Sequence, residues 1–265
     1  MKNQDSILLF GASGQIGKSL IRKFTKNNYK VIAVTRNIHR KGYQLKTQSN
    51  YGYLEVEELN SFSEENISSL MERSTICINL IGILYEKKKN QFKTIHTDLP
   101  SLLAKVAKKK KLKQFIHISA LGIEEAKDSG YALSKLDGEL KARKNFEKTL
   151  IVKPSIVFSV DDNFTTNFMS LLSILPIMPL YYNGKTKFTP IHVTDLANII
   201  FQIVEKKIVG DTIECVGPEV LTFKEIISKI LRSIKKKKIV NTFSIIFSKI
   251  YNKNISINAK TFNNN

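Results

Sequence analysis

The amino-acid sequence predicts an α/β protein built on a doubly wound parallel sheet, with a small lobe formed by its C-terminal part. Three observations predict this fold class. Short β-rich runs alternate with amphipathic helical stretches through the first 160 residues. The β-rich runs are continuously apolar, as expected of strands that helices cover on both faces. A glycine-rich turn joins the first apolar run to the first helical stretch.

The expected elements follow this alternation in chain order. The expected strands cover residues 6–10, 30–35, 53–56, 75–80, 114–119 and 150–154. The expected helices cover residues 16–26, 64–73, 99–110 and 131–145. Because the units repeat as strand and then helix, we assign residues 1–155 to one sheet domain.

The pattern changes after about residue 155. Proline and aromatic residues cluster over 158–190, a helix is expected after Asp195, and a short strand is expected over 212–216. Thr222 and Glu225 have capping-box spacing, which predicts that another helix begins there. We expect residues 156–240 to form a small substrate or docking lobe and residues 241–265 to form a C-terminal tail.

Length and composition exclude several classes of protein. The chain has 265 residues, 42% of them hydrophobic, and a formal net charge of +19. A globular chain of this size buries roughly 70–75% of its unfolded surface, which excludes disordered, collagen-like and small disulfide-scaffold proteins. Three alternatives would explain this positive charge: a polyanionic partner, an anionic membrane surface, or a lysine-rich coding bias. Lysine runs at 87–89, 108–111 and 235–238 lack interleaved aromatic residues, which favours solvated faces over specific nucleic-acid binding.

The cysteines and the apolar segments of the sequence indicate in which cellular compartment the protein is expected. Cys77 and Cys215 each lie inside an apolar run, and no spacing typical of a metal site or a disulfide framework is present. The apolar run 7–10 is too short for a secretory signal, and prolines interrupt the stretch 168–182. We expect a cytoplasmic protein without a transmembrane segment; peripheral contact with the cytoplasmic face of an inner membrane is left open.

The glycine-rich turn predicts a nucleotide site. Residues 11–17 read GASGQIG between the first strand and the first helix. Gly11 suits a tight turn, Gly14 leaves bare backbone for a pyrophosphate, and Gly17 allows close contact between strand and helix. A P-loop is the alternative, since Gly17 is followed by Lys and Ser; its leading glycine would fall on Ala12, so the sequence favours a dinucleotide.

The end of the second expected strand favours NADP(H) over NAD(H). A site for NAD usually places a carboxylate there, to bond the ribose 2′-hydroxyl. Here Arg36 follows the strand, with His39, Arg40 and Lys41 nearby and no carboxylate among them. An arginine fork matches a 2′-phosphate. The alternative is that these cations belong to the general basic excess.

Tyr131 and Lys135 are the candidate catalytic pair. Their spacing places phenol and ammonium on one face of a helix. A lysine there can hold the nicotinamide ribose and lower the pKa of the phenol, which would make the tyrosine a proton donor or acceptor. A tyrosine and a lysine at this spacing are common by chance. They indicate a catalytic pair here because the glycine turn and the alternating strand–helix units precede them.

The order of these motifs resembles the short-chain dehydrogenase/reductase superfamily in its extended form, which has a Rossmann fold and includes NAD-dependent epimerases and dehydratases. More narrowly, the chain resembles the atypical branch typified by the alpha-subcomplex subunit nine of NADH:ubiquinone oxidoreductase (respiratory complex I) and its bacterial relatives. The motifs that carry the resemblance are GASGQIG at 11–17, VTRN at 34–37, INLIGIL at 78–84, FIHISALG at 115–122, YALSKLDGE at 131–139, VKPSIVFSVDDNF at 152–164, FTPIHVTDLA at 188–197 and GPEVLTFKEI at 217–226.

The resemblance implies a dinucleotide site on the N-terminal domain and gives roles to individual residues. Tyr131 would be the acid/base, and no metal is implied. The residues implied to line the cofactor are Gly11, Ser13, Gly14, Gln15, Ile16 and Gly17 at the pyrophosphate, Arg36 at the 2′-phosphate, Leu80, Ile81 and Gly82 at the ribose, Lys135 at the nicotinamide ribose, and Pro154, Ser155 and Val157 at the nicotinamide.

Two departures from the family pattern affect catalysis. Active extended members carry a Ser or Thr hydroxyl where this chain has Ala120; Ser119, one residue earlier, is the alternative hydroxyl. The supporting Asn of the family's catalytic tetrad falls on His96. Loss of the hydroxyl would remove part of the electrostatic stabilisation of a carbonyl substrate.

Two functions remain open from the sequence. The first is a binding protein that holds NADP(H) as a structural ligand, in a role like that of a complex I subunit at a respiratory membrane complex or an anionic membrane surface. The second is an active NADPH-dependent reductase or epimerase/dehydratase that uses Tyr131 and Lys135.

Overall fold

The computed structural model describes residues 5–160, 162, 166 and 184–233. The chain divides into two compact units, the first comprising residues 1–159 and 191–216 and the second residues 160–190 and 217–265. The C-terminal tail expected over 241–265 lies outside the described residues, as do the lysine run at 235–238 and the apolar stretch 168–182. The expected boundaries at residues 155 and 240 stay predictions.

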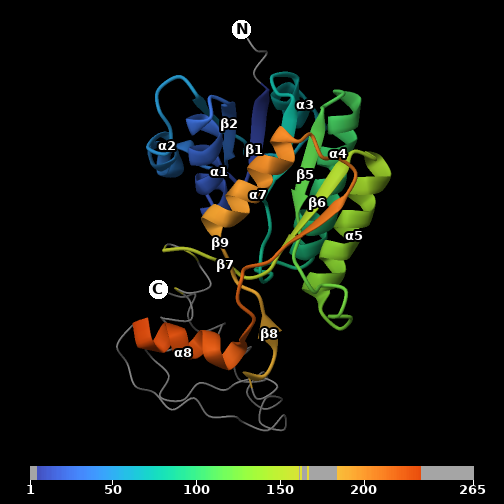
Figure 1. Cartoon of the computed structure of the whole chain (residues 1–265). Helices are drawn as coiled ribbons and strands as arrows, with labels where there is room; N and C mark the ends of the chain where they lie inside the picture. The colour runs from blue at the N-terminus through green and yellow to red at the C-terminus, as the bar shows by residue number, and fades with distance from the viewer. Residues whose placement is uncertain (1–4, 161, 163–165, 167–183, 234–265) are drawn as a thin grey trace, which may run out of the picture. The chain divides into compact units, whose positions relative to one another are not determined.

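A parallel sheet of seven strands forms the centre of the first unit (Figure 1). Its strand order is β10-β6-β5-β4-β1-β2-β3, so the chain winds outward from β1 in both directions. This confirms the predicted doubly wound fold. The strands are β1 Ser6–Phe10, β2 Lys30–Thr35, β3 Leu54–Glu58, β4 Ile76–Asn79, β5 Gln114–Ile118, β6 Thr149–Pro154 and β10 Thr212–Cys215.

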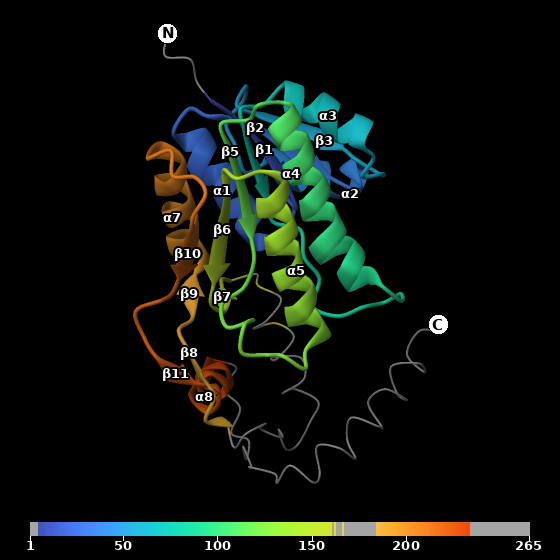
Figure 2. The same ribbon diagram turned by 90° about the vertical axis from the view of Figure 1, so that its right-hand side faces the viewer.

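Helices cover both faces of the sheet (Figure 2), which is why the inner strands β4, β5 and β6 are buried along their whole length. On β1, Ile7 and Leu9 belong to one buried cluster, and Leu8 and Phe10 belong to the cluster on the opposite face. The helices of the first unit are α1 Gln15–Lys26, α2 Ile38–Lys46, α3 Glu64–Glu72, the π-helix η1 Lys93–Asp98, α4 Leu99–Lys109, α5 Gly130–Asn145 and α7 Val193–Glu205.

Neither α2 nor the π-helix η1 is among the elements expected from the sequence. Only Gly42 and Leu45 of α2 are buried, so the helix carries almost no apolar stripe. The side chain of Asn37 accepts a hydrogen bond from the Arg40 amide (2.9 Å) and caps the helix start. In the part of the chain that the structure describes, no helix combines the length and apolarity needed to cross a bilayer.

Short strand pairs complete the two units. In the first unit, β7 Val157–Phe158 pairs in parallel with β9 Ile191–His192. In the second, β8 Lys187–Phe188 pairs antiparallel with β11 Leu221–Thr222, and α8 Phe223–Ser233 follows. The predicted capping box is confirmed, because the Thr222 amide donates to the Glu225 carboxylate (2.7 Å) and the Glu225 amide donates to the Thr222 hydroxyl (3.2 Å).

Candidate functional site

The glycines of the 11–17 turn differ in how tightly their surroundings enclose them. Gly11 has a φ of +77°, in the left-handed region, and a Cβ atom on it would lie 3.1 Å from the Leu80 carbonyl carbon. A Cβ atom on Gly17 would lie 2.4 Å from the Ala12 carbonyl oxygen, so α1 meets the turn more closely than any side chain permits. Gly14 precedes α1, and a Cβ atom there would have no neighbour closer than 3.4 Å.

The turn thus ends on an open helix N-terminus with the features of an anion site. The first amides of a helix have no partners within it, and the helix dipole favours negative charge there. The first turn of α1 contains no acidic residue. The Gln15 side chain turns away from this position: its Nε2 donates to the Val157 carbonyl (3.3 Å), and its Oε1 accepts from the Ser159 hydroxyl (2.8 Å). Gln15 therefore fastens the glycine turn to β7, where the nicotinamide was expected.

A continuous path joins the glycine turn to Lys135. Gly11 lies against Leu80 and Ile81, directly after β4. A Cβ atom on Gly82 would lie 3.4 Å from Lys135 Nζ and 3.7 Å from His96 Nε2. The structure therefore brings together the segments expected at the pyrophosphate, the ribose and the nicotinamide ribose, along the carboxyl edge of the strands.

A carboxylate that the sequence reasoning missed lies beside the end of β2, on the neighbouring strand β3. Arg36 is exposed and forms no ion pair with any described residue. The carboxylate of Glu58, the last residue of β3, accepts a hydrogen bond from the Ile38 amide at the start of α2 (2.6 Å). That bond and one from the Asn60 side chain lower the pKa of Glu58. The parallel register of β2 and β3, which pairs Thr35 with Glu58, produces this proximity.

Tyr131 lies half-buried among aromatic rings at the start of α5. Its ring makes edge-on contacts with His96 (5.2 Å between centroids) and Phe92 (5.9 Å). Burial raises the pKa of the Tyr131 phenol. This is the opposite of the lowering expected from Lys135, whose ammonium group donates to the Ile118 carbonyl (3.1 Å).

His96 is fixed as a neutral ring in the position where the family pattern has Asn. Its Nε2 accepts from the Ile83 amide (3.0 Å), so the ring carries its proton on Nδ1, which lies 2.9 Å from the Ser134 hydroxyl. That hydroxyl in turn donates to the Tyr131 carbonyl (2.7 Å). Burial, and then the nearby charge of Lys135, lower the pKa of His96 to about 4.

A second buried histidine, His117 on β5, lies under α5. Asn79 accepts from the Ile81 amide through Oδ1 (3.1 Å), so its amide nitrogen faces His117 Nδ1 (3.1 Å) and donates to it. Among the described residues, His117 Nε2 and the Ser119 hydroxyl have no hydrogen-bond partner. The backbone of Ser119 continues the sheet, since its amide donates to the Val152 carbonyl (2.8 Å). The Ser119 hydroxyl, the alternative to the one missing at Ala120, is thus held inside the core.

Lys135 is buried close to a network of charged side chains that sequence reasoning also missed. Glu139 lies one helical turn further along α5, and its carboxylate lies 2.9 Å from Lys153 Nζ on β6. Lys153 also pairs with Glu124, which is exposed. Burial lowers the pKa of Lys135 to about 8, and the charge of Glu139 opposes that shift. A lysine inside the apolar run LIVKP was the available signal of this network.

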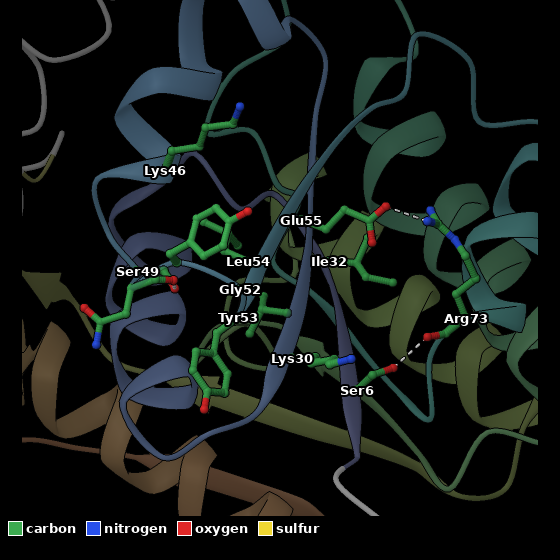
Figure 3. Close-up of a pocket in the computed structure, with 13 residues that line it drawn as sticks. Ser6, Lys30, Ile32, Lys46, Ser49, Gly52, Tyr53, Leu54, Glu55 and Arg73 are labelled. Carbon is green, nitrogen blue, oxygen red and sulfur yellow. Dashed lines mark hydrogen bonds and ion pairs between the residues drawn. The ribbon is translucent and has the colours of Figure 1, made fainter.

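A hollow of about 690 Å³ lies elsewhere in the first unit. It is lined by the beginnings of β1, β2 and β3 and by the connection between α2 and β3, among them Ser6, Lys30 and Tyr53 (Figure 3). None of the predicted cofactor residues lines it, because the glycine turn follows the other end of β1. In parallel sheets of this kind ligands bind beyond the carboxyl ends of the strands. The hollow is therefore separate from the candidate dinucleotide site.

The fold and the order of its motifs define an extended short-chain dehydrogenase/reductase architecture. A UDP-glucuronic acid 4-epimerase from Bacillus cereus, solved with UDP-glucuronic acid and NAD, superposes with a TM-score of 0.72 at 22% identity, over 90% of this chain and 86% of that chain. A dTDP-glucose 4,6-dehydratase from Streptomyces venezuelae, solved with NAD, gives 0.74 at 16% identity, over 90% and 84%. At these identities the similarity is one of fold.

Within that architecture, the chain belongs to the NmrA-like family, whose sequence profile matches residues 3–264. Similar proteins include the mitochondrial NADH-ubiquinone oxidoreductase 40 kDa subunit of Neurospora crassa, 26% identical over 87% of this chain and 60% of that protein. The mitochondrial NADH dehydrogenase [ubiquinone] 1 alpha subcomplex subunit 9 of Dictyostelium discoideum is 28% identical over 84% of this chain and 62% of that protein. The chain thus spans about three fifths of the length of these relatives. The resemblance to this branch, predicted from the motifs, is confirmed.

Proposed function

We propose that the first unit binds NADP(H) and holds it as a structural ligand, in a role like that of a complex I subunit. The observation that carries the proposal is the pairing of a glycine-lined path with an incomplete catalytic set. Gly11, Gly82 and Lys135 line a continuous path from an open helix N-terminus, whereas Ala120 replaces the expected hydroxyl and Ser119 is enclosed in the core. When bound, the nicotinamide would supply hydride chemistry.

Tyr131 and His96 are better suited to a site that binds a dinucleotide than to one that transfers a proton to a substrate. The pKa of Tyr131 is raised, so its phenol is a weaker acid than a free tyrosine. The neutral His96 ring is held by Ile83 and Ser134 and leaves no ring nitrogen for a substrate. A ligand that binds the folded chain stabilises it by mass action even without turnover.

NADP(H) is proposed over NAD(H) because three cations gather at the end of β2. Arg36, Arg40 and Lys41 are all exposed there. The carboxylate of Glu58 lies at the start of α2, and a hydrogen bond from the Ile38 amide already engages it. A 2′-phosphate with two negative charges would gain more from the cations than a ribose hydroxyl would.

The mitochondrial complex I subunits among the relatives support a peripheral place beside a respiratory membrane complex. We propose that the protein lies on the cytoplasmic side of an inner membrane, held by contacts with protein or lipid. Separation of membrane and soluble fractions, followed by a high-salt wash that releases the protein, tests this location.

Mass spectrometry of the nucleotide released from the purified protein tests the cofactor proposal. NADP⁺ or NADPH is expected at near-stoichiometric amounts, and the loaded protein is expected to oxidise no NADPH in the presence of carbonyl compounds or nucleotide sugars. Recovery of NAD⁺ would overturn the choice of dinucleotide, and absence of any nucleotide, together with failure to bind added NADPH, would overturn the site.

An active reductase or epimerase/dehydratase is the second candidate, favoured by the retention of Tyr131 and Lys135 on one helix. Substrate-dependent loss of NADPH absorbance would support it, provided that the activity disappears in a Tyr131→Phe variant that still binds NADPH. Turnover that persists in this variant would eliminate Tyr131 as the acid.

A further inference from the structure

The excess of cations over anions in the first unit is concentrated on one edge of the sheet. In a parallel sheet every helix-to-strand connection lies where the strands begin, opposite the cofactor edge. Six such connections precede β2, β3, β4, β5, β6 and β10. Hydrogen bonds join neighbouring strand beginnings: the Thr75 amide donates to the Ser6 carbonyl (3.0 Å), and the Lys113 amide donates to the Thr75 carbonyl (2.9 Å). We call this edge, which lies at the top of the sheet in Figure 1, the basic edge.

Charge counts differ sharply between the two edges. We count the last four residues of each helix, the connection and the first strand residue, together with Asp5. The basic edge then carries fifteen cationic side chains: Lys23, Lys26, Lys30, Lys46, Arg73, Lys108, Lys109, Lys110, Lys111, Lys113, Arg143, Lys144, Lys148, Lys206 and Lys207. It carries five anionic ones: Asp5, Glu72, Glu147, Glu205 and Asp211.

The opposite edge is nearly balanced on a matching count over its five strand-to-helix connections. It carries nine cationic side chains: Lys18, Arg36, Arg40, Lys41, Lys87, Lys88, Lys89, Lys93 and Lys127. It carries seven anionic ones: Glu58, Glu64, Glu65, Glu86, Glu124, Glu125 and Asp128. A lysine-rich composition alone would load both edges alike. Helix dipoles favour cations in a last turn, but Lys111, Lys113 and Lys148 lie beyond the helix ends.

Most cations of the basic edge are available to a partner. Arg73, Lys109, Lys110 and Lys113 form ion pairs with acidic residues. The other eleven form none within the described residues, and nearly all of them are exposed. The hollow of Figure 3 opens on this edge, where Lys30 and Lys46 line it beside Tyr51, whose side chain is fully exposed.

We infer that the basic edge is a docking surface for an anionic lipid bilayer. The cations are spread over six separate connections, and all but two are lysines, which are strongly hydrated point charges without the planar fork used for specific pairing. Such a diffuse array fits a surface of anionic headgroups. Tyr51 projects from the same edge with an amphipathic ring of the kind that settles at headgroup level. This surface is independent of nucleotide binding, since it lies at the other end of the strands.

Vesicle sedimentation with two charge-matched variants of the full chain tests the inference. One variant replaces Lys26, Lys108, Lys148 and Lys206 of the basic edge by Gln, and the other replaces Lys87, Lys88, Lys89 and Lys127 of the opposite edge. All eight side chains are exposed and form no ion pair within the described residues. Equal net charge separates the effect of position from that of total charge, and unchanged melting temperatures show that both variants fold.

The wild type is expected to bind phosphatidylglycerol/phosphatidylcholine vesicles, to ignore pure phosphatidylcholine, and to be released as salt rises well above about 0.15 M. The basic-edge variant should bind at least about tenfold more weakly, and the control should change by less than about twofold. Equal losses in both variants, or no binding by the wild type, would overturn the inference. Retention on immobilised polyglutamate without vesicle binding would also overturn it and would identify an acidic protein as the partner.

Discussion

A buried ion pair joins Lys153 on β6 to Glu139 on α5, with 2.9 Å between Nζ and Oε2. Both side chains are almost fully enclosed, and the pair lies one helical turn from Lys135, the residue expected to hold the nicotinamide ribose. The carboxylate of Glu139 opposes the lowering of the Lys135 pKa that burial causes. Glu139 thus helps to keep Lys135 charged.

Glu139 should therefore control the pH range in which the dinucleotide binds. With the Lys135 pKa at about 8, NADPH affinity is expected to fall as pH rises through that value and the ammonium group loses its proton. Glu139→Gln should move this fall to lower pH, which fluorescence titrations at several pH values would detect. Asp137→Asn, which alters an exposed pair on the same helix, is the control and should leave the midpoint in place. An unmoved midpoint in a folded Glu139→Gln protein would refute the role.

The two enclosed histidines should make folding sensitive to mild acid. His96 has a pKa of about 4, and the pKa of His117 is well below its ordinary value. Both would take up protons near pH 6.5 once unfolded, so the free energy of unfolding should fall by up to about 1.4 kcal/mol per pH unit for each histidine as pH drops below about 6.5. Urea unfolding between pH 7 and pH 5 measures this slope.

His96→Asn should flatten that pH slope, and replacement of the exposed His39 by Gln should not. An identical slope in the wild type and His96→Asn would show that other groups cause the acid sensitivity.

Gly17 and Gly14 should separate folding from ligand binding. Gly17→Ala drives a methyl group into the Ala12 carbonyl and is expected to cost about 3 kcal/mol of folding free energy. Gly14→Ala has room and should change stability by less than about 0.5 kcal/mol, yet it places a methyl group where a phosphate would approach. Calorimetric titration with NADPH should show weakened binding in a stable Gly14→Ala protein. Full affinity there would remove Gly14 from the proposed phosphate site.

Glu58 and Arg36 should act in opposite directions on the choice of dinucleotide. Arg36→Gln is expected to weaken NADPH binding about tenfold or more through the loss of a charge-assisted hydrogen bond, and to leave NADH binding nearly unchanged. Glu58→Gln removes a negative charge near the proposed 2′-phosphate position and should raise the ratio of NADPH to NADH affinity. Calorimetry with both dinucleotides measures this ratio, and Glu55→Gln serves as a control. Equal losses of both dinucleotides in Arg36→Gln would contradict the assignment.

Local sequence patterns were sufficient to predict those elements that depend on residues close together in the chain. The continuous apolar runs of β1 and β2 predicted strands with correct ends, and Thr222 with Glu225 predicted the helix start that their reciprocal hydrogen bonds create. The helix α2 escaped prediction because it buries little apolar surface. Register across the sheet brings Glu58 to the start of α2, and no local signal marks that proximity.

By itself the sequence determined the fold class, the glycine turn and the motifs that place the chain in its family, because periodicity and turn chemistry are properties of residues close in the chain. Tertiary structure alone decided the states of the polar groups around Lys135. It pairs Glu139 with Lys153, fixes His96 as a neutral ring and raises the pKa of Tyr131. It also places fifteen cations and five anions at one edge of the sheet, and nine cations and seven anions at the other. Burial and long-range packing set these properties, and both arise only when segments distant in sequence meet.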